Sequence, residues 1–200
     1  MPAFTLLGHP VAHSVSPAMH NAAADAIGMD YRYSATDVAP EDLPAVLERL
    51  RSGEWDGANV TIPHKQSVLP LLDELGETAT ALGAANTLVR DGTRLRGENT
   101  DVPGFLAEID LFGVELAGRP ALILGAGGSA RAVAFALLQR GAEVRILARN
   151  LPAAVQFARE LHRATGGHLL NFEWTPTDLG DASQGCALAV NCTPLGMTPQ

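Results

Sequence analysis

Lys65 is the residue in the first half of the chain whose type is best suited to proton transfer. It is the only lysine among 14 lysine and arginine residues. Arginine cannot release a proton near neutral pH, whereas a lysine with a lowered pKa can. Lys65 is therefore a candidate catalytic residue, with an ordinary surface lysine as the alternative.

Neutral hydrogen-bonding side chains cluster in the same half of the sequence. Four of the seven asparagines fall at the ends of predicted elements there: Asn21, Asn59, Asn86 and Asn99. Such ends form the ligand crevice of an open α/β sheet. Hydroxyls and one carboxylate accompany them: Ser14, Ser16, Thr61, Thr100 and Asp101. This set of donors and acceptors suits a small polyhydroxylated ligand.

His9 and His13 are the candidate metal ligands because they are four residues apart. A helix would place both rings on one face, but Pro10 between them and Pro17 shortly after disfavour that helix. We therefore expect no metal site, with the two histidines either capping an element or exposed.

A glycine-rich segment in the second half predicts a dinucleotide site. Its residues are Gly125, Ala126, Gly127, Gly128, Ser129 and Ala130. They follow an apolar strand and open an Ala-rich helix, as the G-x-G-x-x-A pattern requires. Gly125 allows a tight turn, Gly127 lets the backbone approach a pyrophosphate, and Ala130 permits close helix packing. A purely structural glycine turn is the alternative.

Arg149 and Asn150 end the next predicted strand and indicate which nucleotide is bound. NAD sites place an acidic residue there to bind the ribose hydroxyls. This chain instead offers the Arg149 cation for a 2′-phosphate and the neutral Asn150 side chain beside it. The sequence thus favours NADP over NAD, with a solvated surface arginine as the alternative.

Alternating strands and helices must position these residues, which predicts an α/β fold. In the first half we expect strands at 4–7, 31–36, 57–60, 86–90 and 94–97, and helices at 16–28, 40–50 and 66–82. Ser16 and Pro17 would cap the first helix, and Asp91-Gly92 would turn a hairpin. In the second half we expect helices at 101–113, 127–139 and 153–165, and strands at 120–124, 142–148 and 187–190. A boundary near residue 100 gives two domains, 1–100 and 101–200.

The composition limits the classes of molecule that this protein is expected to bind. Charged residues are 18% of the chain and the net charge is −8, which disfavours nucleic acid and anionic membranes. No apolar run approaches the length of a membrane span, and the first residues do not resemble a signal peptide. Cys186 and Cys192 fit two reduced thiols. We expect a cytoplasmic protein with a small-molecule substrate, and the oligomeric state stays open, a homodimer included.

Six segments, taken together, resemble the shikimate dehydrogenase family. They are Ser14-Val15-Ser16-Pro17 with His20-Asn21, NVTIPHK ending at Lys65, GAANT at 83–87, Asn99-Thr100-Asp101, GAGGSARA from Gly125, and NCTPLGM at 191–197. The resemblance implies an N-terminal α/β substrate-binding domain, 1–100, and a Rossmann-like NADP-binding domain, 101–200. It also implies NADPH-dependent, reversible reduction of 3-dehydroshikimate to shikimate.

The same resemblance implies roles for individual residues. Ser14 and Ser16 would bind the substrate carboxylate. The ring hydroxyls would be held by Asn59, Thr61, Asn86 and Asp101. Lys65 and Asp101 would form the catalytic pair, with Lys65 stabilising the charge that grows on oxygen and delivering a proton.

The sequence departs from the family pattern in two places. Ala148-Arg149-Asn150 replaces the usual Asn-Arg-Thr, which leaves the strength of the NADP preference open. Family members also continue beyond NCTPLGM, whereas this chain stops at Gln200, so we expect a C-terminally truncated chain with an incomplete second domain. The alternatives are a quinate/shikimate dehydrogenase that uses NAD, another cyclic-substrate reductase, and a non-catalytic NADP-binding regulatory module.

Overall fold

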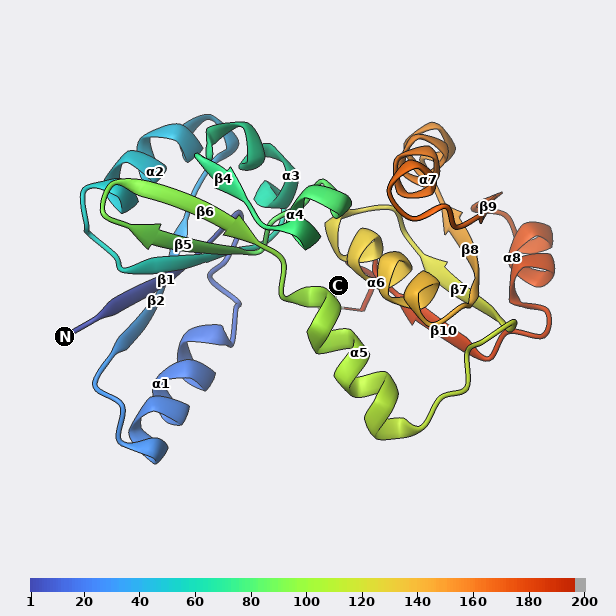
Figure 1. Cartoon of the computed structure of the whole chain (residues 1–200), viewed down its shortest axis with the longest axis horizontal. Coiled ribbons are helices and arrows are strands. Elements are labelled where there is room, and N and C mark those ends of the chain that lie inside the picture. Colours follow the sequence, from blue (N-terminus) through green and yellow to red (C-terminus); the bar gives the residue numbers. More distant parts are fainter. Residues whose placement is uncertain (197–200) are drawn as a thin grey trace. The chain divides into compact units, whose positions relative to one another are not determined.

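The chain folds into two compact units, Met1–Thr100 and Asp101–Gln200 (Figure 1). The structure is a computed structural model, and it describes residues 1–196. Each unit is built on its own sheet, of six strands in unit 1 and four strands in unit 2. The mixed α/β architecture with parallel strands confirms the fold class predicted from the sequence.

Unit 1 contains the sheet β2-β1-β3-β5-β6-β4. Its strands are β1 (Ala3–Gly8), β2 (Arg32–Asp37), β3 (Gly57–Val60), β4 (Glu74–Leu75), β5 (Thr87–Asp91) and β6 (Arg94–Glu98). Its helices are α1 (Ser16–Ile27), η1 (Pro40–Asp42), α2 (Leu43–Arg51), α3 (His64–Ser67), η2 (Leu69–Leu71) and α4 (Glu77–Leu82). The predicted hairpin is confirmed, since β5 and β6 pair antiparallel with Asp91 opposite Arg94.

The strand directions bring the ends of several strands to one edge of this sheet. Strands β1, β2 and β3 are mutually parallel, so their carboxyl ends meet there. Strand β5 runs antiparallel to β3, with Thr87 opposite Asn59, so the amino end of β5 lies at the same edge. The reversal of β6 brings Glu98 opposite Thr87. We call this edge, which carries Asn59, Asn86, Thr87 and Thr100, the polar edge of unit 1.

Helix α2 closes the core of unit 1. Its Leu43, Val46, Leu47 and Leu50 are all buried, as expected for one apolar stripe at helical spacing. They pack with strand residues such as Leu7, Val60 and Leu88 in one cluster. The apolar spacing seen in the sequence therefore fixes the helix against the sheet.

Unit 2 contains the parallel sheet β10-β7-β8-β9. Its strands are β7 (Pro120–Leu124), β8 (Glu143–Ala148), β9 (Leu169–Glu173) and β10 (Leu188–Asn191). Its helices are α5 (Asp101–Phe112), α6 (Gly128–Gln139), α7 (Leu151–Thr165) and α8 (Pro176–Ser183). The chain passes from β7 to β8 and β9 on one side and returns to β10 on the other. The sheet order therefore reverses between β7 and β10, and such switch points bind ligands in open α/β sheets.

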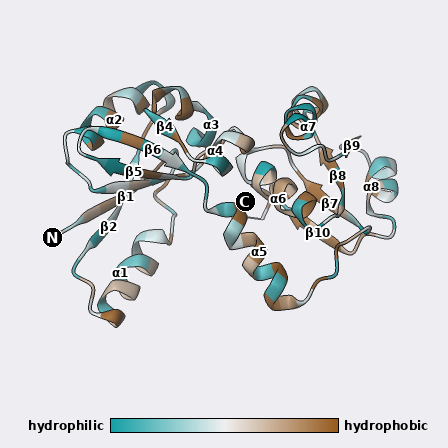
Figure 2. Cartoon of the chain, in the orientation of Figure 1, coloured by the Kyte–Doolittle hydropathy of each residue, from teal (hydrophilic) through white to brown (hydrophobic). Residues whose placement is uncertain are grey.

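The core of unit 2 is made from near-continuous apolar strands, brown in Figure 2 along β7 and β8. Ile123, Ile146 and Leu147 are at most 1% exposed. Helix α6 buries small residues against the sheet, including Ala130 and Ala134, both wholly buried. Small side chains let the helix approach the strands closely, so the glycine-rich segment at its start is held against the edge of the sheet.

The helical stretch predicted over 66–82 is confirmed only in part. That stretch forms α3, η2, the short strand β4 and α4. Pro70 has no N–H with which to continue the helical hydrogen bonds, and Leu72 has extended backbone with φ −99° and ψ 152°. Asp73 then accepts hydrogen bonds from the Leu95 N–H, at 2.7 Å, and from Arg51. These contacts join the segment to β6 as an edge strand.

Strand β9 and helix α8 have no counterpart in the elements predicted from the sequence. A local signal for α8 is present, because Thr175 precedes Pro176 and stands three residues before Asp178, the pattern of a capped helix start. The Thr175 hydroxyl accepts the Asp178 N–H at 3.1 Å. Asp178 in turn accepts the N–H of Glu173, the last residue of β9, at 2.8 Å.

Replacing Gly8 with alanine should destabilise unit 1, because the added Cβ would overlap Thr61 Cγ2 and lie 2.7 Å from Val11 Cγ1. We expect the free energy of unfolding in urea, followed by circular dichroism, to fall by about 1–3 kcal/mol. Gly104→Ala is the control, since no described atom lies within 4 Å of its Cβ position in α5. That change should raise stability by about 0.5–1 kcal/mol. An unchanged stability in Gly8→Ala would contradict the close packing at the end of β1.

Candidate active site

Asn59 stands at the centre of the polar edge of unit 1. Its Oδ1 accepts a hydrogen bond from the Tyr33 hydroxyl at 2.7 Å. Its Nδ2 donates to the Asn86 carbonyl and to Thr87 Oγ1, each at 3.2 Å. These partners come from β2 and from the start of β5, so the amide is fixed from two sides.

Asn86 joins the ends of β5 and β6. Its side chain is only 9% exposed. The Oδ1 accepts the Thr100 N–H at 2.9 Å and the Thr87 hydroxyl at 3.0 Å, and Nδ2 donates to Thr100 Oγ1 at 3.0 Å. Its backbone N–H donates to the Glu98 carbonyl at 3.0 Å. The two asparagines are thus linked in one network that ends at Thr100.

Lys65 lies on the short helix α3, directly after the polar edge. Its side chain is half-buried, and its carbonyl accepts the Ala85 N–H at 2.8 Å. The preceding His64 is wholly buried, with Nε2 2.7 Å from the Val38 carbonyl. Thr61 is also half-buried, and its carbonyl accepts the His64 N–H at 2.8 Å. The backbone that carries Lys65 is therefore held on both sides.

Ser14 and Ser16 lie together at the start of α1. Ser16 is not the helix cap predicted from the sequence, because Val15 occupies that position and Ser16 is already helical. The Ser14 hydroxyl accepts the Ser16 N–H at 3.2 Å and donates to Ser16 Oγ at 3.2 Å. The first helical N–H is thus bonded to a hydroxyl two residues upstream of the expected cap. Both side chains are half-buried.

Asn21 is not at the end of an element, as the sequence analysis expected, but in the middle of α1. It donates to the Tyr33 carbonyl and accepts the Tyr33 N–H, each at 2.9 Å. Strand β2 is at the edge of its sheet, so these bonds satisfy backbone groups that have no neighbouring strand. The role of Asn21 is to fasten α1 to β2. Asn99 is buried, and its Nδ2 donates to the Ala84 carbonyl at 3.0 Å.

Tyr33 was not singled out in the sequence, yet it contacts the centre of the polar edge. Its side chain is 7% exposed, and the His20 ring stacks on it with centroids 4.1 Å apart. Burial, with a smaller contribution from nearby Tyr31, raises the pKa of Tyr33 to about 12. The phenol therefore stays protonated near neutral pH and acts as a donor.

Asp101 is the first residue of α5 and of unit 2, and its side chain is half-buried. It follows Thr100 directly, whose N–H and hydroxyl are bonded to Asn86. The catalytic pair predicted from the resemblance therefore has one member on α3 and the other at the start of α5.

The glycine-rich segment has the conformation that phosphate binding needs. Gly125 has φ +106°, in the region that favours glycine, and its N–H donates to the Leu147 carbonyl at 2.9 Å. No described atom lies within 4 Å of the place where a Cβ on Gly127 would be, so the backbone there is open to a ligand. Helix α6 begins at Gly128, with Ser129 in its first turn. N–H groups at such a helix start bind phosphates.

A second loop lies beside this segment at the switch point. Asn191, the last residue of β10, accepts the Thr193 N–H at 2.9 Å and donates to the Leu195 carbonyl at 3.0 Å. Thr193 Cγ2 would be 3.1 Å from a Cβ on Gly125. This loop belongs to the NCTPLGM motif, whose last residue, Met197, lies outside the described residues.

Arg149 directly follows β8 and is exposed. Asn150 caps α7, because its Oδ1 accepts the Ala153 N–H at 3.1 Å. Parallel strands β7 and β8 end on the same edge, so Arg149 and the glycine-rich segment lie at neighbouring strand ends. The residues present fit a dinucleotide that carries a 2′-phosphate: an open glycine backbone, a helix start and an exposed cation after the next strand.

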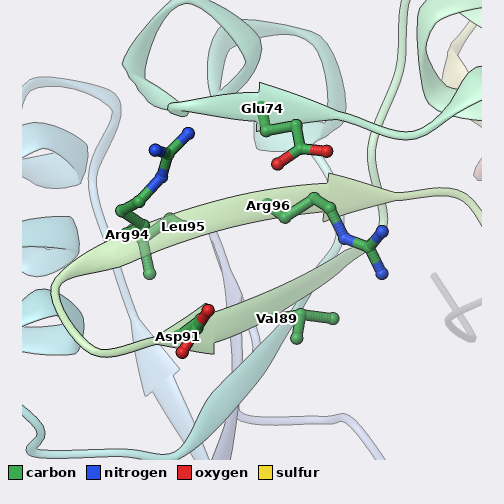
Figure 3. A pocket seen from close by; sticks show the side chains of 6 residues that line it. All are labelled: Glu74, Val89, Asp91, Arg94, Leu95 and Arg96. Atoms are coloured by element: carbon green, nitrogen blue, oxygen red, sulfur yellow. The ribbon is translucent and has the colours of Figure 1, made fainter.

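One hollow on unit 1 lies away from these residues, on the exposed face of β4, β5 and β6. Figure 3 shows its lining, which is Glu74, Val89, Asp91, Arg94, Leu95 and Arg96. Two acidic and two basic side chains give it no net charge, and it contains none of the predicted site residues.

Among residues 1–196 no group of three or more His, Cys, Asp or Glu could hold a metal ion. His9 is instead 3.0 Å from the Asp37 carboxylate. Within the same residues no helix is long and apolar enough to cross a membrane.

Known proteins resemble this chain over nearly its whole length. Residues 6–88 match the family model described as the shikimate dehydrogenase substrate binding domain. A curated relative from Salinibacter ruber, shikimate dehydrogenase (NADP(+)), is 46% identical and covers 98% of this chain, which spans 69% of that relative.

Solved structures also resemble this chain over nearly its whole length. Shikimate 5-dehydrogenase from Thermus thermophilus, in complex with NADP(H) and shikimate, superposes with a TM-score of 0.83 at 41% identity, over 97% of this chain and 69% of that one. Quinate dehydrogenase from Corynebacterium glutamicum, in complex with NAD, has a TM-score of 0.87 at 32% identity, over 100% of this chain and 73% of its own.

The sequence similarity thus extends through both units, the polar edge and the glycine-rich segment included. Identity of 46% over 98% of the chain, with two thirds of the relative covered, is decisive. The chain belongs to the shikimate dehydrogenase family.

Proposed function

We propose that this protein catalyses the NADPH-dependent, reversible reduction of 3-dehydroshikimate to shikimate, a step in the biosynthesis of aromatic amino acids. The single observation that carries the proposal is the polar edge of unit 1. There Asn59 is bonded to Asn86, and the backbone of Lys65, the only lysine of the chain, is bonded to Ala85, the residue before Asn86. Neutral donors and acceptors beside one cation suit a small acid with several hydroxyls.

Each substrate group has residues of matching chemistry. Ser14 and Ser16 bind the carboxylate, for which two adjacent hydroxyls at a helix start are good donors. Ring hydroxyls are held by Asn59, Thr61, Asn86 and Asp101. The fixed network around both asparagines means that little ordering is needed when the substrate binds.

Lys65 stabilises the negative charge that develops on the substrate oxygen during reduction and gives a proton to it. In the oxidative direction it takes the proton back. Asp101 accepts hydrogen bonds from a substrate hydroxyl and balances the lysine charge. The Ala85 N–H and the contact of His64 with the Val38 carbonyl fix the backbone of α3 from which the Lys65 side chain extends.

NADP is held by the glycine-rich segment, Gly125, Ala126, Gly127, Gly128, Ser129 and Ala130, and by the end of β8. When bound, the nicotinamide supplies or receives the hydride. Open backbone at Gly127 and the start of α6 bind the pyrophosphate. Arg149 binds the 2′-phosphate, and Asn150 both caps α7 and contacts the nucleotide.

An assay distinguishes this function from two alternatives, a quinate/shikimate dehydrogenase and a non-catalytic NADP-binding module. NADPH formation is measured with the purified chain and shikimate plus NADP, and compared with quinate and with NAD. Turnover of shikimate with NADP supports the proposal, whereas a preference for quinate or NAD would favour a quinate/shikimate dehydrogenase. Nucleotide binding without turnover in a protein as long as the curated relative, of which this chain spans 69%, would favour a non-catalytic module. A cytoplasmic location, a homodimer and the lack of nucleic-acid and membrane partners stay predictions from the sequence.

Removing the Lys65 side chain should impair chemistry more than binding. In Lys65→Ala we expect kcat to fall by roughly 10²- to 10⁴-fold while the dissociation constant of shikimate changes far less, because the contact strengthens as charge develops. Gln66→Ala, at the exposed next position of α3, is the matched control and should leave kcat unchanged. Retention of kcat with a raised KM in Lys65→Ala would make the lysine a binding residue only.

Reversing the charge at Arg149 should change the nucleotide preference. Loss of a charge-assisted hydrogen bond costs about 1.5–3 kcal/mol, so the NADP/NAD ratio of kcat/KM should fall by about 10- to 100-fold in Arg149→Asp. Arg159→Asp makes the same charge change at an exposed position of α7 and should keep the ratio. An equal effect of both variants would show that only the net charge of the unit matters.

A further inference from the structure

Tyr33 lies behind the proposed substrate residues without being one of them. Its hydroxyl donates to Asn59 Oδ1 at 2.7 Å, the shortest of the three hydrogen bonds of that amide. The phenol ring cannot move aside easily, because the Tyr33 backbone is bonded to Asn21 through both its N–H and its carbonyl. The stacked His20 ring covers it.

The three bonds determine what the Asn59 side chain can offer to a ligand. An amide has two N–H donors and an oxygen with two lone pairs. The Asn86 carbonyl and Thr87 Oγ1 each lie within 3.2 Å of Nδ2 and use the two donors. Tyr33 uses one lone pair, and it is the one donor to Oδ1 among residues 1–196. What remains is a single acceptor site on the oxygen.

We propose that Tyr33 is a positioning residue that holds the Asn59 amide with its oxygen toward the substrate, so that Asn59 selects a ligand hydroxyl. This inference rests on the function proposed above and deepens it. A hydroxyl can donate to the remaining acceptor site, whereas a carboxylate or a carbonyl oxygen would meet another acceptor and be repelled. Tyr33 thereby contributes to discrimination between a polyhydroxylated acid and its deoxy or oxo analogues at one ring position.

Tyr33→Phe removes the hydroxyl and keeps the ring. In the full chain we expect the dissociation constant of shikimate, measured by calorimetry, to rise about tenfold, and kcat to change less than about twofold, because a hydrogen bond that orients a binding group is lost. Tyr31→Phe is the matched control. Its hydroxyl donates to the His20 carbonyl at 3.1 Å, in the same region but away from Asn59. Equal affinities in the two variants would overturn the inference.

A double-mutant cycle separates positioning from general loosening. If Tyr33 acts through Asn59, adding Tyr33→Phe to Asn59→Ala should change the shikimate dissociation constant by less than about twofold. A full tenfold effect in the Asn59→Ala background would show that Tyr33 acts elsewhere. Among analogues of shikimate that each lack one hydroxyl, the one without the hydroxyl read by Asn59 should bind wild type and Tyr33→Phe equally.

Whether the Asn59 side-chain amide is held in place can be measured without any ligand. The Asn59 side-chain NH₂ resonances should shift and exchange faster with solvent in Tyr33→Phe, and stay as in wild type in Tyr31→Phe. Unchanged resonances in Tyr33→Phe would overturn the inference whatever the affinities. Failure of the wild-type chain to bind shikimate would instead overturn the proposed function, and with it the substrate that Asn59 is assigned to read.

Discussion

The antiparallel pairing of β5 with β3 decides where the polar side chains of unit 1 lie. Were all strands parallel, the residues before β5 would be at the opposite edge from the ends of β1 and β3. The reversal instead places Asn86 beside Asn59, and the following hairpin returns the chain to Thr100 at the same edge. Residues separated by more than 40 positions in the sequence thereby form one hydrogen-bonded network. The site is thus a consequence of strand direction.

Unit 2 depends on a related property of its sheet, the reversal of strand order between β7 and β10. The reversal leaves the glycine-rich segment and the loop around Asn191 side by side, with Thr193 close to Gly125. A side chain at Gly125 would meet that loop and would also have to adopt φ +106°. Glycine is therefore required there for packing as well as for the approach of a ligand.

Much of the fold follows from local sequence. The stripe of α2, the Asp91-Gly92 turn and the glycine-rich segment each contain their own signal, and each element forms as predicted. Other features need the sheet order, which no local pattern contains. Asn21 and Tyr33 matter because β2 is an edge strand beside β1, and Asp73 matters because it meets β6. The capped start of α8 at Thr175 is a case where the signal was present locally.

The polar edge is held together by hydrogen bonds between residues of unit 1 itself. Hydrogen exchange of the Thr100 backbone amide tests it most directly, because this N–H donates to Asn86 Oδ1 at 2.9 Å although the residue itself is exposed. In the ligand-free protein we predict strong protection of this amide, which is lost in Asn86→Ala. Exchange at the rate of an unstructured peptide in the wild-type protein would contradict the account.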